Sequence, residues 1–197
     1  MTHQPHSNQN IKSNNEARLQ KRAFVVWFTG LPCSGKTTLA KALHQELQQQ
    51  NIQTFILDGD EMRKGLSKDL GYSIEDRKEN IRRAAEASKL LMEAGVITLS
   101  CFIAPTEALR EMVKQIVGKE NVIEVFVKCP VEVCEQRDVK GMYRKARNNE
   151  LKDFTGVSSV FEEPADVDLV LDTSVLDVSA CVARLTGVVQ ERLMQRV

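Results

Sequence analysis

Short apolar runs alternate along the chain with longer stretches in which large apolar residues return every three or four positions. The runs cover residues 24–29, 53–57, 96–103, 122–127 and 168–171. Runs of this length that are rich in Val, Ile and Phe predict buried strands, and the stretches between them predict amphipathic helices. This alternation favours an α/β fold with three layers, in which a mostly parallel five-stranded sheet has helices on both faces.

Several helices have clear signals of their own. The first carries Leu39, Leu43 and Leu47 on one face. A second begins after Ser73, whose hydroxyl is a favourable N-cap, and extends to about Ala94, where Gly95 ends it. Apolar repeats predict further helices within residues 109–116 and 178–193, with a short one after residue 130.

A glycine-rich loop of the pattern G-x-x-x-x-G-K-[ST] lies between the first strand and the first helix. The loop consists of Gly30, Leu31, Pro32, Cys33, Ser34, Gly35, Lys36 and Thr37, and Thr38 follows it. Strand, loop and helix come in the order of a P-loop, whose backbone N–H groups and helix dipole bind phosphates. Lys36 would reach the β- and γ-phosphates, and the Thr37 hydroxyl would bind Mg²⁺. The loop and its flanking elements therefore predict a P-loop NTPase fold, similar to that of nucleotide kinases, that binds a nucleoside triphosphate. The phosphate acceptor is left open.

Two aspartates, Asp58 and Asp60, follow the second strand on either side of Gly59. The carboxyl ends of strands in open α/β sheets are where ligands bind. A carboxylate close to a P-loop can hold Mg²⁺ or accept the proton of an attacking hydroxyl group. The alternative is an ordinary Asp-Gly turn.

Residues that could bind an anionic ligand gather in two further stretches of the sequence. Arg63, Arg77 and Asn80 are candidates for binding an anionic or polar ligand, because arginine suits bidentate recognition of oxyanions. Residues 137–156, which begin with Arg137 and are named the basic lid here, are rich in cations and contain few large apolar residues. These features predict a mobile lid rather than part of a core. Such a cationic lid would exclude water during phosphoryl transfer, although a solvated basic helix fits the composition equally well.

Composition and charge limit the partners and the cellular environment that are expected for this chain. The 27 Lys and Arg residues balance the 27 Asp and Glu residues, and no apolar run is long enough to span a bilayer, so neither nucleic acid nor a membrane is an expected partner. The cysteines form no C-x-x-C pair, which favours a reducing, cytoplasmic environment. Residues 1–20 predict a flexible polar tail, followed by one domain over residues 21–197.

Several stretches together resemble the adenylylsulfate kinase (APS kinase) family. They are residues 27–38, 57–60 with Arg63, 69–73, 76–83, 124–127, 134–138, 140–141, 145–147 and 154–156. The run from Asp76 to Arg83 and the Phe154-Thr155-Gly156 segment are far more specific than a P-loop. The similar stretches lie between about Ala23 and Thr173, which is nearly all of the predicted domain.

The resemblance implies that ATP and adenosine 5′-phosphosulfate (APS) react to give ADP and 3′-phospho-APS (PAPS). The resemblance implies that Lys36 and Asp60 are catalytic, with Asp60 either as general base for the ribose 3′-hydroxyl or as a ligand of Mg²⁺ beside Thr37. The residues implied to bind APS are Asp60, Arg63, Tyr72, Arg77, Asn80, Ile103 and Phe154, with Tyr72 and Phe154 on either side of its adenine. Arg137 would border the ATP base. The resemblance also suggests a homodimer, and it leaves open whether the chain is functionally coupled to a separate ATP sulfurylase.

Three positions depart from the family pattern. Ala104 stands where a serine often described as a phosphoenzyme intermediate is common, so direct in-line transfer from ATP is expected. Glu107 replaces a common arginine and would remove a positive charge near the anion site, and Cys33 replaces a small residue of the P-loop. Because of these departures, a kinase for another small molecule and a non-catalytic nucleotide sensor remain alternatives.

Overall fold

The computed structural model describes residues 23–195, so the predicted tail at residues 1–20 lies outside the described residues. Its five strands are β1 (Val25–Thr29), β2 (Thr54–Asp58), β3 (Ile97–Cys101), β4 (Val122–Lys128) and β5 (Leu169–Asp172). They pair in parallel in the order β2-β3-β1-β4-β5. The predicted five-stranded parallel sheet is confirmed.

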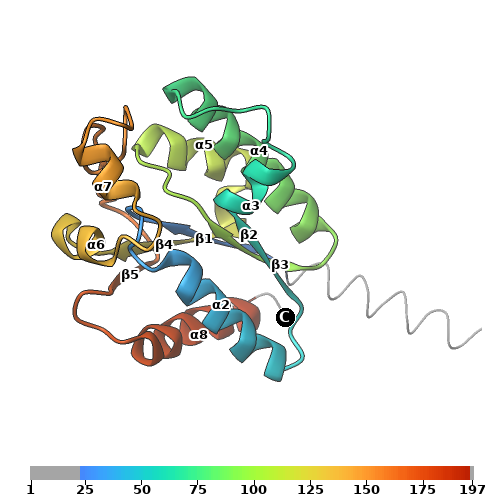
Figure 1. Cartoon of the computed structure of the whole chain (residues 1–197). Helices are drawn as coiled ribbons and strands as arrows, with labels where there is room; N and C mark the ends of the chain where they lie inside the picture. Colours follow the sequence, from blue (N-terminus) through green and yellow to red (C-terminus); the bar gives the residue numbers. More distant parts are fainter. Residues whose placement is uncertain (1–22, 196–197) are drawn as a thin grey trace, which may run out of the picture.

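Helices cover both faces of this sheet and complete the three predicted layers (Figure 1). Helices α2 (Lys36–Gln49) and α8 (Val178–Gln195) pack on one face, and α4 (Ile74–Glu93) and α5 (Glu107–Val117) pack on the other. The shorter elements are α3 (Gly59–Lys64), α6 (Val131–Arg137), α7 (Met142–Arg147) and the 3₁₀ helix η1 (Lys119–Asn121). Among residues 23–195, no helix is long and apolar enough to cross a membrane.

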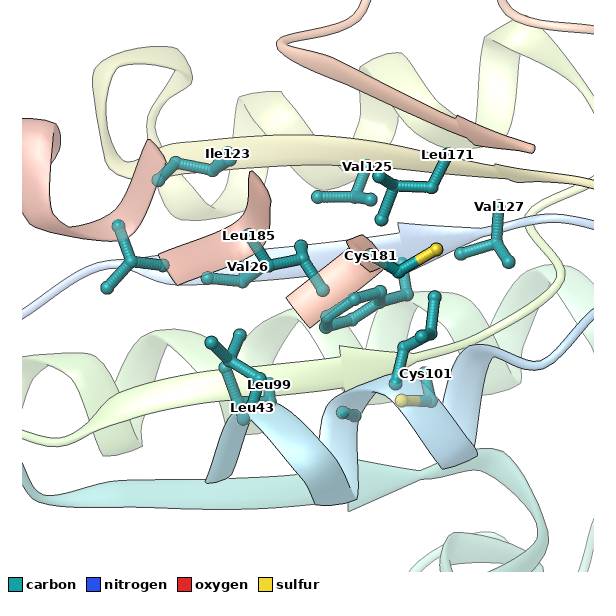
Figure 2. Close-up of a cluster of buried hydrophobic side chains, with 14 of the residues drawn as sticks. Val26, Leu43, Leu99, Cys101, Ile123, Val125, Val127, Leu171, Cys181 and Leu185 are labelled. Carbon is teal, nitrogen blue, oxygen red and sulfur yellow. The ribbon is translucent and has the colours of Figure 1, made fainter. Parts of the chain in front are cut away.

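The larger core lies between the sheet and the pair α2 and α8. Side chains such as Val26, Leu99 and Val125 point from neighbouring strands towards Leu43 of α2 and Leu185 of α8 (Figure 2). The central strand β1 is buried along its whole length, as expected for a parallel strand covered on both faces. This packing holds the carboxyl end of β1, and therefore the P-loop that follows, in place.

The chain direction after β1 and β3 creates the crevice in which open α/β sheets bind ligands. These strands are neighbours, but β1 leads to α2 on one face, whereas β3 leads to α5 on the other. Connections that diverge in this way leave a gap at the carboxyl edge of the sheet. Gly30, at the start of the P-loop, and Ile103, after β3, lie there, and the N–H of Gly30 donates to the Ile103 carbonyl oxygen at 3.4 Å.

Two short helices, α3 and α7, lie outside the predicted elements. Helix α3 begins at Gly59, where an Asp-Gly turn was the alternative expectation, and Asp58 caps it by accepting a hydrogen bond from the Asp60 N–H at 2.9 Å. Helix α7 lies in the basic lid (Figure 1). The expectation that the lid contributes nothing to a core is wrong, because Tyr143, Ala146 and Phe154 are buried in a small hydrophobic cluster.

Candidate active site

The P-loop depends on glycine where the backbone is most crowded. Gly30 has φ of +147°, and a Cβ atom at this position would lie 2.4 Å from the carbonyl oxygen of Val127. Gly35 has φ of +105° and is the N-cap residue of α2, so the first N–H groups of that helix are directed into the loop. The loop therefore presents backbone N–H groups and a helix dipole to an anion, as its motif predicts.

Lys36 is held inside the loop. Its Nζ atom donates hydrogen bonds to the carbonyl oxygens of Gly30 at 2.8 Å and Leu31 at 2.7 Å. Desolvation lowers the pKa of the ammonium group from 10.5 to about 8, although Asp58 and nearby thiols oppose this shift. The positive charge is thus kept where phosphates would bind, at a cost that an anionic ligand would offset.

The structure brings Thr37 together with Asp58. The Thr37 hydroxyl donates to Asp58 Oδ2 at 2.6 Å, and the other carboxylate oxygen caps α3. A hydroxyl and a carboxylate side by side at a P-loop fit magnesium, which proteins hold through one or two such groups while phosphates and waters complete the coordination. Asp60, which the sequence analysis assigned to the metal, has its carboxylate paired with Lys140 of the basic lid instead.

Asp60 and Lys140 are both exposed, with 63% and 60% of their side chains accessible. The hydrogen bond between them raises the pKa of Lys140 above its usual value. Asp60 lies in the first turn of α3, whereas Lys140 precedes α7, so this contact joins the lid to α3. The pairing was not predicted, because 80 residues separate the two side chains.

Arg63, Tyr72 and Arg77 form a cluster beside α3 and the start of α4. The guanidinium of Arg63 lies over the Tyr72 ring, 4.5 Å from its centroid, and donates to the Gly71 carbonyl oxygen at 2.6 Å. Arg77 donates to the Tyr72 carbonyl oxygen at 2.9 Å and to the Thr155 hydroxyl at 3.1 Å. Burial lowers the pKa of Arg77, with the nearby Arg63 charge acting in the same direction. Two cations and an aromatic face are therefore placed together, as predicted for a substrate that has a purine and an oxyanion.

Asn80 and Phe154, two of the residues predicted to bind the substrate, are both buried. Asn80 is only 6% exposed, and its Oδ1 atom has no hydrogen-bond partner among the described residues. Since buried polar atoms are rarely left unpaired, Oδ1 is suited to a donor on a ligand. Phe154 is 8% exposed and packs edge-on against Tyr143, with ring centroids 5.0 Å apart, while Tyr143 donates to the Pro32 carbonyl oxygen at 3.1 Å.

Arg137, at the end of α6, contacts the other side of the P-loop. Its guanidinium donates to the Ser34 carbonyl oxygen at 3.4 Å and to the Thr173 carbonyl oxygen at 2.7 Å. The Thr173 hydroxyl donates to the same Ser34 oxygen at 2.8 Å. Thr173 was not predicted as a site residue, and only its position directly after the last strand could have indicated it.

The loop after β3 is bonded to the end of β1 and to Gly30, the first residue of the P-loop. The Thr29 hydroxyl donates to the Ile103 carbonyl oxygen at 2.6 Å. Ala104 is fully buried and has φ of +40°, which alanine rarely adopts. From the sequence, Glu107 was expected only to remove a positive charge. In the structure it also forms an ion pair. Its carboxylate accepts hydrogen bonds from Arg110 Nη2 at 2.6 Å and Nε at 3.2 Å.

The comparisons with known proteins agree on one family. A sequence model described as adenylylsulphate kinase matches residues 22–172. An adenylyl-sulfate kinase of Shewanella amazonensis is 49% identical over 179 residues, with 90% of each chain covered, and one of Bacteroides fragilis is 48% identical over 182 residues, covering 92% of this chain and 90% of the relative. The Mycobacterium tuberculosis APS kinase, solved in complex with AMPPNP and APS, is 35% identical with a TM-score of 0.83, covering 86% of this chain and 98% of that one.

Matches of this extent include the P-loop, both aspartates, the arginine cluster and the basic lid. The chain belongs to the adenylylsulphate kinase family.

Proposed function

We propose that this chain transfers the γ-phosphate of ATP to the 3′-hydroxyl of adenosine 5′-phosphosulfate, giving PAPS and ADP. The observation that carries the proposal is the family match over residues 22–172, because that range includes both a phosphate-donor loop and a cluster suited to a sulfated nucleotide. The contacts of individual side chains support a role for each of them.

The P-loop binds the donor. Its N–H groups and Lys36 hold the β- and γ-phosphates, with Lys36 exchanging its carbonyl partners for phosphate oxygens. Thr37 and Asp58 would hold Mg²⁺, and the bond of 2.6 Å between them supports this assignment for Asp58 in preference to Asp60. The ion, when bound, neutralises phosphate charge and orients the phosphates. Arg137 borders the ATP base, since it contacts the outer side of the loop together with Thr173.

Asp60 is the general base for the acceptor. It accepts the proton of the 3′-hydroxyl while the oxygen attacks the γ-phosphorus, and the bond from this phosphorus to the β–γ bridging oxygen breaks to release ADP. For this step Lys140 has to leave Asp60, because it is paired with the carboxylate that has to accept the proton of the 3′-hydroxyl. Once released, the Lys140 ammonium would be available to stabilise the negative charge of the transferring group.

The acceptor binds at the arginine cluster. Arg63 and Arg77 bind the phosphosulfate, Asn80 accepts a hydrogen bond through its free Oδ1 atom, and Tyr72 stacks on the adenine from the side opposite Phe154. Tyr72 is 59% exposed, so it can move onto the adenine when APS binds. Ile103 is placed next to the P-loop, because its carbonyl oxygen accepts hydrogen bonds from the Thr29 hydroxyl and the Gly30 N–H.

Transfer is direct, without a phosphoenzyme at the loop after β3. Ala104 has no hydroxyl group, and it is fully buried in the core beneath α4 and α5.

We further propose that the protein is a cytoplasmic homodimer that works with a separate ATP sulfurylase. The assignment of the assembly rests on the family resemblance, and that of the location on the five cysteines, none of which forms a disulfide.

The test is the release of ADP from Mg·ATP by the purified protein, with APS, with adenosine 5′-phosphate or with a sugar acid as acceptor. Release that depends on APS alone supports the proposal. Release that depends on the sugar acid would identify another small-molecule kinase. ATP binding without any acceptor-dependent release would identify a nucleotide sensor.

A further inference from the structure

Arg110 of α5 has almost no contact with solvent, although it is charged. The residue is 2% exposed, and its guanidinium reaches four different groups. Nε and Nη2 donate to the Glu107 carboxylate, and Nε also lies 3.5 Å from Glu124 Oε1. Nη1 donates to the carbonyl oxygens of Ala104 at 3.1 Å and Glu162 at 2.9 Å. A buried arginine is tolerated only when it is paired in this way, so its position is tightly specified.

The two carbonyl groups belong to segments that are far apart in the sequence. Ala104 is in the loop after β3, which is bonded to Thr29 at the end of β1, directly before the P-loop. Glu162 ends the segment that begins with Phe154 and Thr155, and Thr155 accepts a hydrogen bond from Arg77. Arg110 thus connects the loop bound to the phosphate-donor site with the segment bound to the acceptor cluster.

Glu162 strengthens the same connection from its own side. Its N–H donates to the Pro105 carbonyl oxygen at 2.8 Å, and its carboxylate accepts a hydrogen bond from the Glu107 N–H at 2.7 Å. Together, Arg110, Glu162 and the loop 104–107 are named the clasp here. The clasp also explains how Ala104 keeps its rare backbone conformation, because Thr29 and Arg110 both donate to its carbonyl oxygen.

We propose that Arg110 is a positioning residue for the acceptor site: it holds the loop after β3 and the segment after Phe154 in one arrangement, and so determines where APS lies relative to the P-loop. The proposal rests on the proposed function, since it takes Ile103 and Phe154 as part of the APS site. Lysine cannot replace Arg110, because a single ammonium group cannot reach two carbonyl oxygens and a carboxylate with the geometry of a planar fork.

The test compares the steady-state KM values for APS and ATP in Arg110→Lys and wild-type protein. Losing a charge-assisted hydrogen bond within the clasp is expected to raise KM for APS about tenfold, with less than about a twofold change for ATP. The control is Arg192→Lys, because Arg192 also bridges a carbonyl oxygen and a carboxylate but lies on α8, away from the clasp. Equal increases in both KM values, or the same pattern in Arg192→Lys, would overturn the proposal.

A milder pair of variants keeps the proposal testable if Arg110→Lys does not fold. Glu162→Ala removes an exposed carboxylate from the clasp, whereas Glu163→Ala removes the neighbouring one, which pairs with Lys128 at 3.7 Å. The first is expected to raise KM for APS about threefold and the second to leave it unchanged. Unchanged APS kinetics in Glu162→Ala would contradict the proposal. Wild-type protein without APS-dependent turnover would instead refute the proposed function.

Discussion

The pKa of Lys36 predicts that the affinity for ATP falls as the pH rises through about 8. In the free protein, desolvation lowers the pKa of this ammonium from 10.5 to about 8. Bound phosphates favour the charged form and raise the pKa again, so ATP binding is accompanied by proton uptake above this pH. The difference between these pKa values corresponds to roughly 3.5 kcal/mol, at about 1.4 kcal/mol for each pKa unit, by which desolvation disfavours the charged form.

The size of the effect follows from the fraction of charged Lys36. With a pKa of about 8, about nine-tenths of the molecules carry the charge at about pH 7 and about one-tenth at about pH 9. If only the charged form binds, the Kd for a nucleotide triphosphate rises about tenfold between these pH values. At about pH 8, binding should take up about half a proton.

Isothermal titration calorimetry with AMPPNP at saturating Mg²⁺ measures both quantities, because proton uptake is obtained from buffers that differ in ionisation enthalpy. The matched variant is Lys36→Arg, whose guanidinium stays charged over the whole range. Its affinity is expected to be the same at both pH values, even if it is weaker than in the wild type. Equal wild-type affinity at both pH values, or an equal fall in Lys36→Arg, would refute the reasoning.

Three further variants test individual residues of the site. Asp60→Asn is expected to lower kcat by a factor of about 10² or more while ATP binding changes little, and near-normal turnover would exclude Asp60 as the general base. Asp58→Asn should raise the Mg²⁺ concentration for half-maximal activity about tenfold, whereas an unchanged requirement would argue against the pairing with Thr37 at the metal. Gly30→Ala should destabilise the fold by about 2 kcal/mol or more in denaturant unfolding and abolish ATP binding, because its Cβ would lie 2.4 Å from the Val127 carbonyl oxygen. Gly187→Ala, which meets no atom within 4 Å, is the control and should unfold no more easily than wild type.

The fold and the donor loop could be predicted because their signals are local. Apolar runs identified all five strands, and the hydroxyl of Ser73 caps α4 as expected, accepting a hydrogen bond from the Asp76 N–H at 3.1 Å. Gly30 and Gly35 also follow from local chemistry, since both have positive φ values in a loop with a known pattern. Such features depend on residues within a few positions of one another.

Contacts between distant residues could not be predicted in the same way. Asp58 and Asp60 are equivalent in the sequence, and only the first turn of α3 places one beside Thr37 and the other beside Lys140. The lid was expected to lack core residues because its composition is basic, yet Tyr143 is fully buried against Phe154. Composition records the exposed cations of a short helix and does not show that one of its faces is apolar.

Glu107 departs from the family pattern, and the structure gives its carboxylate an ion-pair partner. The sequence indicated only a lost positive charge, but the structure pairs this carboxylate with the buried Arg110 three residues later. The spacing of three positions is common for ion pairs along a helix. The burial of Arg110 and its bonds to Ala104 and Glu162 depend on the tertiary fold, so the sequence alone could not indicate them.

The most direct measurement of the central claim is the transfer of the labelled γ-phosphate from ATP to APS. The ribose position that carries the labelled phosphate is then identified. The purified protein, Mg²⁺, γ-labelled ATP and APS are incubated, and the nucleotide product is treated with a 3′-nucleotidase. Label on the sulfated nucleotide that the 3′-nucleotidase releases is the predicted result. Label that stays in ATP and inorganic phosphate, or that reaches an acceptor other than the 3′-hydroxyl of APS, would contradict the proposed reaction.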